Sequence, residues 1–165
     1  MADTFSFDIV SEVNLQEVDN AINQARKEIG QRYDFKGSQS SIELDQKEKR
    51  LTVASDDDFR LRSVLDILQN KLIKRGVPLK ALAYGTIGPA AGGTVRQVIA
   101  LRVGIEKDNA KRIVAMIKAT KLRVQAQIMD DQVRVSAKNK DDLQAVISLI
   151  RKADLEFAVQ FTNYR

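Results

Sequence analysis

The sequence predicts an α+β protein in which one strand–helix–strand–strand–helix–strand unit occurs twice. Short segments that alternate apolar and polar residues are interleaved with longer segments whose apolar residues recur every three or four positions. The same order returns in the second half of the chain, where the hairpin and second helix are displaced by about 82 residues. We therefore expect a tandem of two ferredoxin-like (βαββαβ) domains, each with two helices on one face of an antiparallel sheet and the other face free.

The first unit covers residues 1–84. Residues 5–10 alternate as a half-buried strand does, and Asn14 with Glu17 forms a capping box before the first helix. The remaining expected elements are strands at 41–44, 51–54 and 79–84, and a second helix whose apolar stripe is Leu61, Val64, Leu65, Leu68 and Leu72.

Residues 85–94 interrupt the pattern, because four of the chain's eight glycines lie within them. Such a segment holds neither a stable helix nor a stable strand, and we interpret it as a mobile linker or a hairpin loop between the units. The second unit covers residues 95–165. Its expected elements are strands at 95–103, 122–129, 132–137 and 156–162, a helix at 107–120, and a helix capped by Asn139.

The composition excludes most routes to catalysis. The chain contains no histidine and no cysteine, so it lacks the usual general base, a thiol nucleophile and the common zinc ligands. A carboxylate-based phosphodiesterase would need a metal, and the acidic residues at 56–58 and 130–131 are better explained by a helix start and a hairpin turn. We therefore expect no enzyme, no catalytic residue, no metal and no cofactor.

The sequence also predicts a cytoplasmic protein. No apolar run approaches the ~18 residues that cross a bilayer, and the N-terminus lacks the basic start and apolar stretch of a signal peptide. Lys and Arg number 27 against 22 Asp and Glu, a net charge of +5 that mildly favours polyanionic partners. No membrane partner is expected.

Polar side chains cover one face of the hairpin predicted in the second unit. Strand alternation places Arg123, Gln125, Gln127, Arg134 and Ser136 on the face opposite the valines. Arginines bind phosphates and amides hydrogen-bond bases, so this face is a candidate nucleotide site; the alternative is an ordinary solvated sheet face. On either view Arg134 is expected to point outward, so that its removal leaves the fold intact. The hairpin has none of the aromatic residues that an RNA-recognition motif uses for stacking.

Two other segments carry candidate nucleotide ligands. Arg32 and Lys36 flank Tyr33 and Phe35 after the first helix, which suits an anion with stacked bases, although a buried aromatic pair explains the rings equally well. Lys138 and Lys140 precede a helix start, which favours phosphate, but two aspartates already occupy that helix terminus.

Several of these segments resemble the YajQ family of bacterial nucleotide-binding proteins. The segments are FSFDIVSE (5–12), RYDFKG (32–37), VQAQI (124–128), QVRV (132–135), KDDLQ (140–144) and QFTNYR (160–165). The resemblance implies a tandem of ferredoxin-like domains with exchanged N-terminal strands, so that residues 5–10 join the second sheet and residues 95–103 the first. The sequence departs from the family pattern at Lys140, where an arginine is expected. A lysine cannot form the bidentate contact with phosphate that an arginine forms.

The resemblance and the residues together lead to a functional hypothesis. We expect a non-catalytic sensor or adaptor that binds cyclic-di-GMP or a related guanine nucleotide and acts on a regulatory partner, such as a transcription regulator. The alternative is an RNA-binding protein that uses its open sheet faces on transfer or ribosomal RNA. Salt separates the two, because RNA binding through several phosphates weakens steeply as salt rises and binding of a two-phosphate ligand does not.

Overall fold

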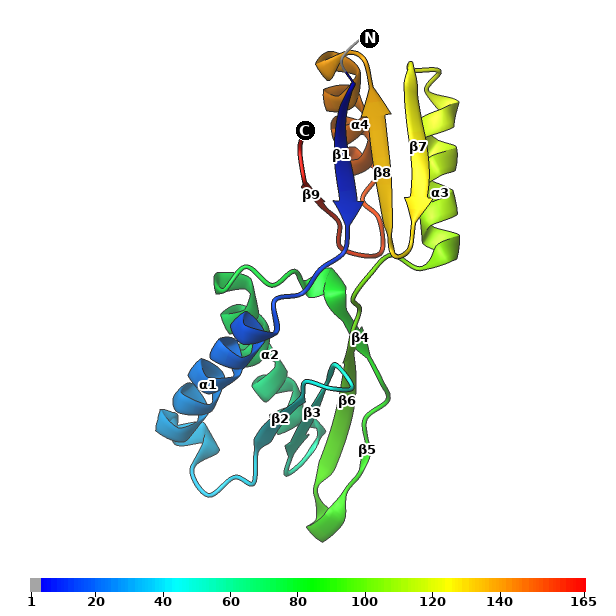
Figure 1. The fold of residues 1–165 in the computed structure, drawn as a ribbon. Coiled ribbons are helices and arrows are strands. Elements are labelled where there is room, and N and C mark those ends of the chain that lie inside the picture. Colours follow the sequence, from blue (N-terminus) through cyan, green and yellow to red (C-terminus); the bar gives the residue numbers. More distant parts are fainter. Residues whose placement is uncertain (1–3) are drawn as a thin grey trace. The chain divides into compact units, whose positions relative to one another are not determined.

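The computed structural model describes residues 4–165, which form two compact units. The central unit comprises Val13–Arg102. The terminal unit combines the N-terminal segment up to Glu12 with Val103–Arg165. In the described residues the chain is an α+β protein with four α-helices and two antiparallel sheets (Figure 1).

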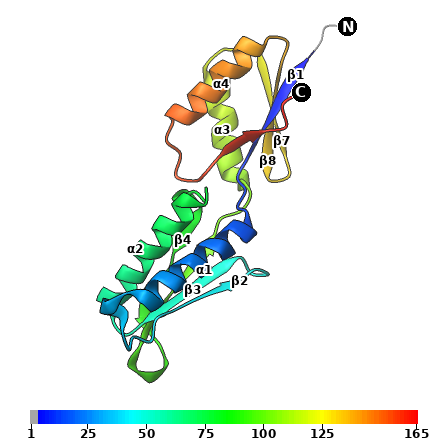
Figure 2. The ribbon, with the colours of Figure 1, turned by 90° about the vertical axis from the view of Figure 1, so that its left-hand side faces the viewer.

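The terminal unit is a four-stranded sheet with two helices on one face (Figure 2). The strand order is β7-β8-β1-β9, and every neighbouring pair is antiparallel. The strands are β1 (Phe5–Val10), β7 (Val124–Met129), β8 (Gln132–Ala137) and β9 (Gln160–Thr162). The helices are α3 (Lys107–Ala119) and α4 (Lys140–Lys152).

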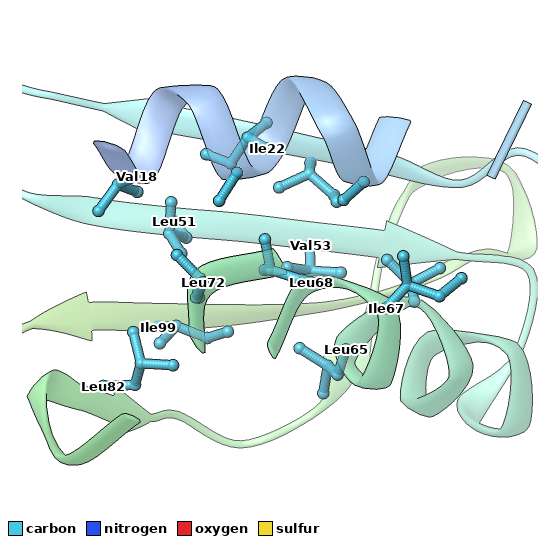
Figure 3. Packing of buried hydrophobic residues seen from close by; sticks show 14 of the residues in the cluster. Val18, Ile22, Leu51, Val53, Leu65, Ile67, Leu68, Leu72, Leu82 and Ile99 are labelled. Atoms are coloured by element: carbon cyan, nitrogen blue, oxygen red, sulfur yellow. The ribbon is translucent and has the colours of Figure 1, made fainter. Parts of the chain in front are cut away.

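The central unit has the same layers. Its strand order is β2-β3-β6-β4, with the short strand β5 also paired to β6. The strands are β2 (Ser41–Asp45), β3 (Arg50–Ser55), β4 (Leu82–Tyr84), β5 (Gly88–Pro89) and β6 (Val95–Leu101). The helices are α1 (Leu15–Gln31) and α2 (Asp58–Lys74), and their apolar residues pack on one face of the sheet (Figure 3).

Two strands belong to one unit although the helix that follows each of them in sequence belongs to the other. Strand β1 directly precedes α1, yet it pairs with β8 and β9 in the terminal unit. Strand β6 precedes α3, yet it pairs with β3 and β4 in the central unit. Phe7 and Ile9 are accordingly buried in the terminal core and Ile99 in the central core.

The glycine-rich segment folds against β6. The N–H of Gly85 donates to the carbonyl of Val98 at 2.8 Å, and Gly88 and Pro89 pair with Arg96 and Val95. A Cβ on Gly85 would lie 2.8 Å from that carbonyl oxygen, so only glycine permits the approach. Of the two interpretations of residues 85–94, a mobile linker or a hairpin loop, the pairing agrees with the hairpin loop, and it lies inside the central unit and not between the units.

Each unit buries its own apolar core. In the central unit, Val18 and Ile22 of α1 and Leu68 and Leu72 of α2 pack over Leu51 of β3 (Figure 3). In the terminal unit, the valines and aromatic residues of β8 and β1 pack against the stripes of α3 and α4. None of the helices in residues 4–165 is long and apolar enough to span a membrane.

Candidate functional site

The face of the terminal sheet opposite its helices is polar. The register aligns Gln125 with Ser136 and Gln127 with Arg134 across β7 and β8. On the next strand, Asp8 stands opposite Arg134. The polar side chains predicted from the strand alternation therefore share one face with a carboxylate.

Arg134 is held by that carboxylate. Its Nε donates to Oδ1 of Asp8 at 2.9 Å and its Nη2 to Oδ2 at 3.3 Å. Asn163 and Gln132 donate to the same carboxylate at 2.8 Å and 3.4 Å, and Asp8 is only 3% exposed. The hydrogen bonds from Arg134 lower the pKa of Asp8, against the opposing effect of burial, and Asn163 lowers it further. Arg134 lies on the open face, as expected from the strand alternation, but its removal would leave a buried carboxylate without its main hydrogen-bond partner. We therefore no longer expect that the fold is indifferent to the loss of Arg134.

A cavity of about 530 Å³ opens beside this face, and we call it the first cavity. Three of the residues predicted to bind a nucleotide line it, namely Arg123, Gln125 and Lys138. The other lining residues are Thr4, Ser136, Ala137, Asn139 and Asp142. Asn139 caps α4 by accepting the N–H of Asp141 at 2.8 Å, so the first cavity adjoins a helix N-terminus. Gln127 and Arg134 do not line it.

Lys140 lies in a different place from Lys138. Its Nζ is 4.9 Å from the centroid of the Phe5 ring, and it lines a second cavity of about 380 Å³. The second cavity is lined by Phe5, Ser6, Lys140, Leu143, Gln144, Ile147, Tyr164 and Arg165. The two lysines around the start of α4 thus serve separate cavities, because the chain enters the helix between them.

Arg32 and Lys36 belong to the central unit, whereas the other six predicted ligands belong to the terminal unit. Arg32 donates to both carboxylate oxygens of Asp34, at 3.0 and 2.8 Å, and lies 3.6 Å from Glu28. Its charge is therefore already compensated. The two aromatic residues of this segment differ, since Phe35 is buried in the core and Tyr33 is 88% exposed.

The comparisons with known proteins cover the whole described chain. A family model described as "Nucleotide-binding protein YajQ-like" matches residues 5–165. The chain belongs to the YajQ family. It is 59% identical over 165 residues to a "Nucleotide-binding protein" of Carboxydothermus hydrogenoformans, with all of both chains covered. It is 58% identical over 160 residues to a protein of the same name from Trichlorobacter lovleyi, covering 97% of this chain and 98% of that one. These matches confirm the family resemblance, and neither relative has the name of an enzyme.

Sequence reasoning missed two residues of this YajQ protein that stand out in the structure. One is Asp8, whose position in an alternating strand already placed it on the polar face, although nothing local identified Arg134 as its partner. The other is Phe59, which is 79% exposed on the first turn of α2 and lies outside the apolar stripe of that helix. That mismatch with the stripe was the signal that could have found it.

Phe59 and Tyr33 lie on neighbouring segments of the central unit. The hydroxyl of Ser38 donates to Asp56 at 2.5 Å, and the N–H of Gln39 donates to the same carboxylate at 3.1 Å. These bonds tie the loop after Tyr33 to the start of α2, and the bond from Ser38 is the main cause that lowers the pKa of Asp56. Among residues 4–165, no three acidic, histidine or cysteine side chains come together as metal ligands would.

Proposed function

We propose that this YajQ protein binds a nucleotide without catalysis and that the first cavity receives its phosphate groups. The observation that carries the proposal is the joint presence of Arg123 and Lys138 on one cavity at the N-terminus of α4. A guanidinium and an ammonium group attract phosphate, and the helix dipole acts in the same direction. The names of the relatives, "Nucleotide-binding protein", support the same ligand class.

The remaining lining residues suit the rest of a nucleotide. The amide of Gln125 and the hydroxyl of Ser136 can hydrogen-bond a base or ribose, and about 530 Å³ is within the usual range of small-molecule sites. Within residues 4–165, Asp142 is the one carboxylate of the lining, and the two cations outnumber it. Gln127, in the next row of the open face, would extend the contact surface beyond the cavity.

The ligand that we propose is cyclic-di-GMP or a related guanine nucleotide, with the loaded protein acting on a regulatory partner. Two cationic groups on one cavity match the two phosphates of a cyclic dinucleotide. We also assign both units to the ferredoxin-like fold with exchanged first strands. The matching strand orders support this, because β1 in one sheet and β6 in the other stand in corresponding positions.

A calorimetric titration tests the proposed site. Cyclic-di-GMP, GTP and a short RNA are each titrated into the wild type, Arg123→Ala and Lys138→Ala. Loss of one charge-assisted phosphate contact should weaken nucleotide binding roughly ten- to a hundredfold in either variant. Arg112→Ala is the matched control, since Arg112 lies on α3, forms an exposed ion pair with Glu156 at 3.4 Å and does not line the cavity. Unchanged affinity in both site variants would reject the first cavity as the phosphate site.

RNA binding is the second candidate, and one observation favours it. Tyr33 and Phe59 are the two most exposed large apolar side chains of residues 4–165, and bases stack on such rings. Tyr33 lies in a short 3-10 helix after α1 and Phe59 in the first turn of α2, and not on an open sheet face, where we expected RNA to bind. RNA binding at this place would weaken in Tyr33→Ala and Phe59→Ala and fall steeply with salt, whereas nucleotide binding in the first cavity would do neither.

A further inference from the structure

The second cavity combines an apolar wall with two cations. Phe5, Leu143, Ile147 and the ring of Tyr164 supply apolar surface, while Lys140 and Arg165 supply positive charge. None of the lining side chains that the structure describes is a carboxylate. None of the ion pairs found among residues 4–165 involves Lys140 or Arg165, although Arg165 acts on Asp8 at longer range. Among the described residues, the cavity therefore brings two cationic side chains together with apolar surface.

Main-chain hydrogen bonds build the wall of this cavity. The N–H of Ser6 donates to the carbonyl of Arg165 at 3.2 Å, and the N–H of Arg165 donates back to Ser6 at 3.0 Å. The pair continues the line of β9 along β1 and holds the last residues in place. The Tyr164 ring lies 6.1 Å from the ring of the buried Phe7, which orients it against the core. A wall that is anchored in this way is preorganised for a ligand.

The lining also unites segments that are far apart in the sequence. It draws on residues 5–12, 140–144 and 160–165, three of the segments on which the resemblance to the YajQ family rests. The fold itself requires only the buried residues of these segments. Lys140 and Gln144 are at the surface of α4, so their meeting with Tyr164 at one cavity is not explained by the core.

We propose that the second cavity is a separate binding site for a small aromatic anion, meaning a planar ring system that bears one acidic group. The ring packs against Phe5, Tyr164 and the aliphatic residues of α4, while the acidic group lies between Lys140 and Arg165. The Gln144 amide can donate to the same group. Such a ligand makes both the apolar and the charged contacts, whereas a plain hydrocarbon makes only the first and inorganic phosphate only the second.

The site is distinct from the one proposed for the nucleotide. No residue of the described range 4–165 lines both the first and the second cavity. Lys140 already shows the chemistry of the site, because its ammonium group rests over the Phe5 ring at 4.9 Å. An incoming acidic group would pair with that ammonium and leave the Phe5 ring for the aromatic part of the ligand.

The probe for the test is 8-anilinonaphthalene-1-sulfonate, which has fused rings and one sulfonate and whose fluorescence rises in apolar surroundings. The wild-type protein is expected to bind it at one saturable site. Lys140→Ala and Tyr164→Ala should each weaken binding, Lys140→Ala by roughly ten- to a hundredfold because it removes a charge-assisted contact. Lys152→Ala, in the last turn of the same helix, is the matched control and should bind as the wild type does.

Two further measurements keep the result unambiguous. Near-ultraviolet circular dichroism verifies that each variant is folded, because the probe also binds loosened proteins. Amide chemical shifts of the unmodified protein should move at Phe5, Lys140, Gln144 and Tyr164 during the titration. The inference is overturned if these amides do not respond, or if Arg123→Ala lowers probe binding as much as Lys140→Ala does. Nucleotide binding in the first cavity is decided separately, by the titrations of Arg123→Ala and Lys138→Ala with nucleotides.

Discussion

At the scale of single residues, Asp8 organises the polar face of the terminal unit. Its carboxylate accepts hydrogen bonds from Arg134, Gln132 and Asn163, which come from one neighbouring strand and the C-terminal segment. A buried carboxylate is tolerated only because these donors replace its water. Asp8 therefore fixes the orientation of the Arg134 side chain on the open face.

The stability that Asp8 contributes should depend on pH. Its pKa is lowered in the folded protein, mainly by the hydrogen bonds from Arg134, so folding favours the charged form. The contribution is complete above the ordinary carboxyl pKa of about 4 and is lost as the pH falls through the lower pKa of the folded state. In urea unfolding, Asp8→Asn should be clearly less stable than the wild type at pH 7, and the gap should narrow toward pH 2. Asp66→Asn, exposed on α2, is the control that should unfold like the wild type at pH 7. A gap of constant size at all pH values would contradict the assignment.

Gly104 shows how one residue admits a close approach of two segments. Its φ is +86°, and a Cβ there would lie 2.8 Å from Oδ2 and 3.0 Å from Cβ of Asp131. Its N–H meanwhile donates to the carbonyl of Ser11 at 2.6 Å. Gly104→Ala should destabilise the protein by about 1–3 kcal/mol, because alanine is strained at this φ and also meets Asp131.

Gly30→Ala is the matched control for that prediction. Gly30 lies inside α1, and a Cβ at this position would meet no other segment within 4 Å, so alanine should be neutral or stabilising by up to about 1 kcal/mol. Thermal melts of both variants decide the point. Equal effects of the two substitutions would show that the backbone at Gly104 is not restrictive.

At the scale of elements, the four helices differ in how they begin. Asn14, Asp57 and Asn139 cap α1, α2 and α4 through side-chain hydrogen bonds to the first turn. Glu106 occupies the same position before α3 and makes no such bond. Its side chain is one methylene longer than that of aspartate, and glutamate is not among the preferred capping residues.

Glu106→Asp should therefore stabilise the terminal unit. The shorter carboxylate can accept an N–H of the first turn, which is worth about 0.5–1 kcal/mol, while the charge stays the same. Glu106→Gln keeps the length of the side chain and should not raise the melting temperature. The comparison is made by differential scanning calorimetry. A melting temperature for Glu106→Asp that equals that of Glu106→Gln would show that α3 gains nothing from a cap.

At the scale of the whole molecule, one strand of each unit is next in sequence to a helix of the other unit. Strand β1 of the terminal unit precedes α1 of the central unit, and β6 of the central unit precedes α3 of the terminal unit. Phe7 is fully buried in the terminal core, and Ile99 is fully buried in the central core. Each lies on a strand next in sequence to a helix of the other unit. A substitution in either strand should therefore loosen the unit to which the strand belongs and not the helix that follows it in sequence.

Amide hydrogen exchange can show which unit a core substitution loosens. Phe7→Ala should cost about 3–5 kcal/mol and Ile99→Ala about 2–5 kcal/mol, as large-to-small changes in a core do. Phe7→Ala should speed amide exchange in α3, α4 and β8 and leave α1 and α2 protected, and Ile99→Ala should do the reverse. Faster exchange in α1 after Phe7→Ala would contradict the strand pairing described above.

Local patterns were enough to locate the helices and most strands. The stripe from Leu61 to Leu72 is buried in α2 as predicted, because its spacing matches the helical turn whatever the helix packs against. The alternation in β7 and β8 likewise placed Gln125, Gln127 and Ser136 on one face, and the register confirms it. Two strands are shorter than expected: the one predicted at 79–84 covers only Leu82–Tyr84, after a 3-10 helix at Leu79–Ala81, and the one predicted at 156–162 covers only Gln160–Thr162. Phe157 and Ala158 are buried there without strand pairing, so their apolar character did not indicate a strand.

By itself the sequence determined the α+β class, the order of the elements, the absence of histidine and cysteine chemistry and the resemblance to the YajQ family. Only the tertiary structure decided which partners the polar residues have: Arg134 pairs with Asp8, Lys138 and Lys140 line different cavities, and Tyr33 is exposed while Phe35 is buried. The physical reason is range. The direction of a side chain follows from the local backbone period, whereas its partner depends on which strand edges meet, and Asp8 meets Arg134 across more than a hundred intervening residues.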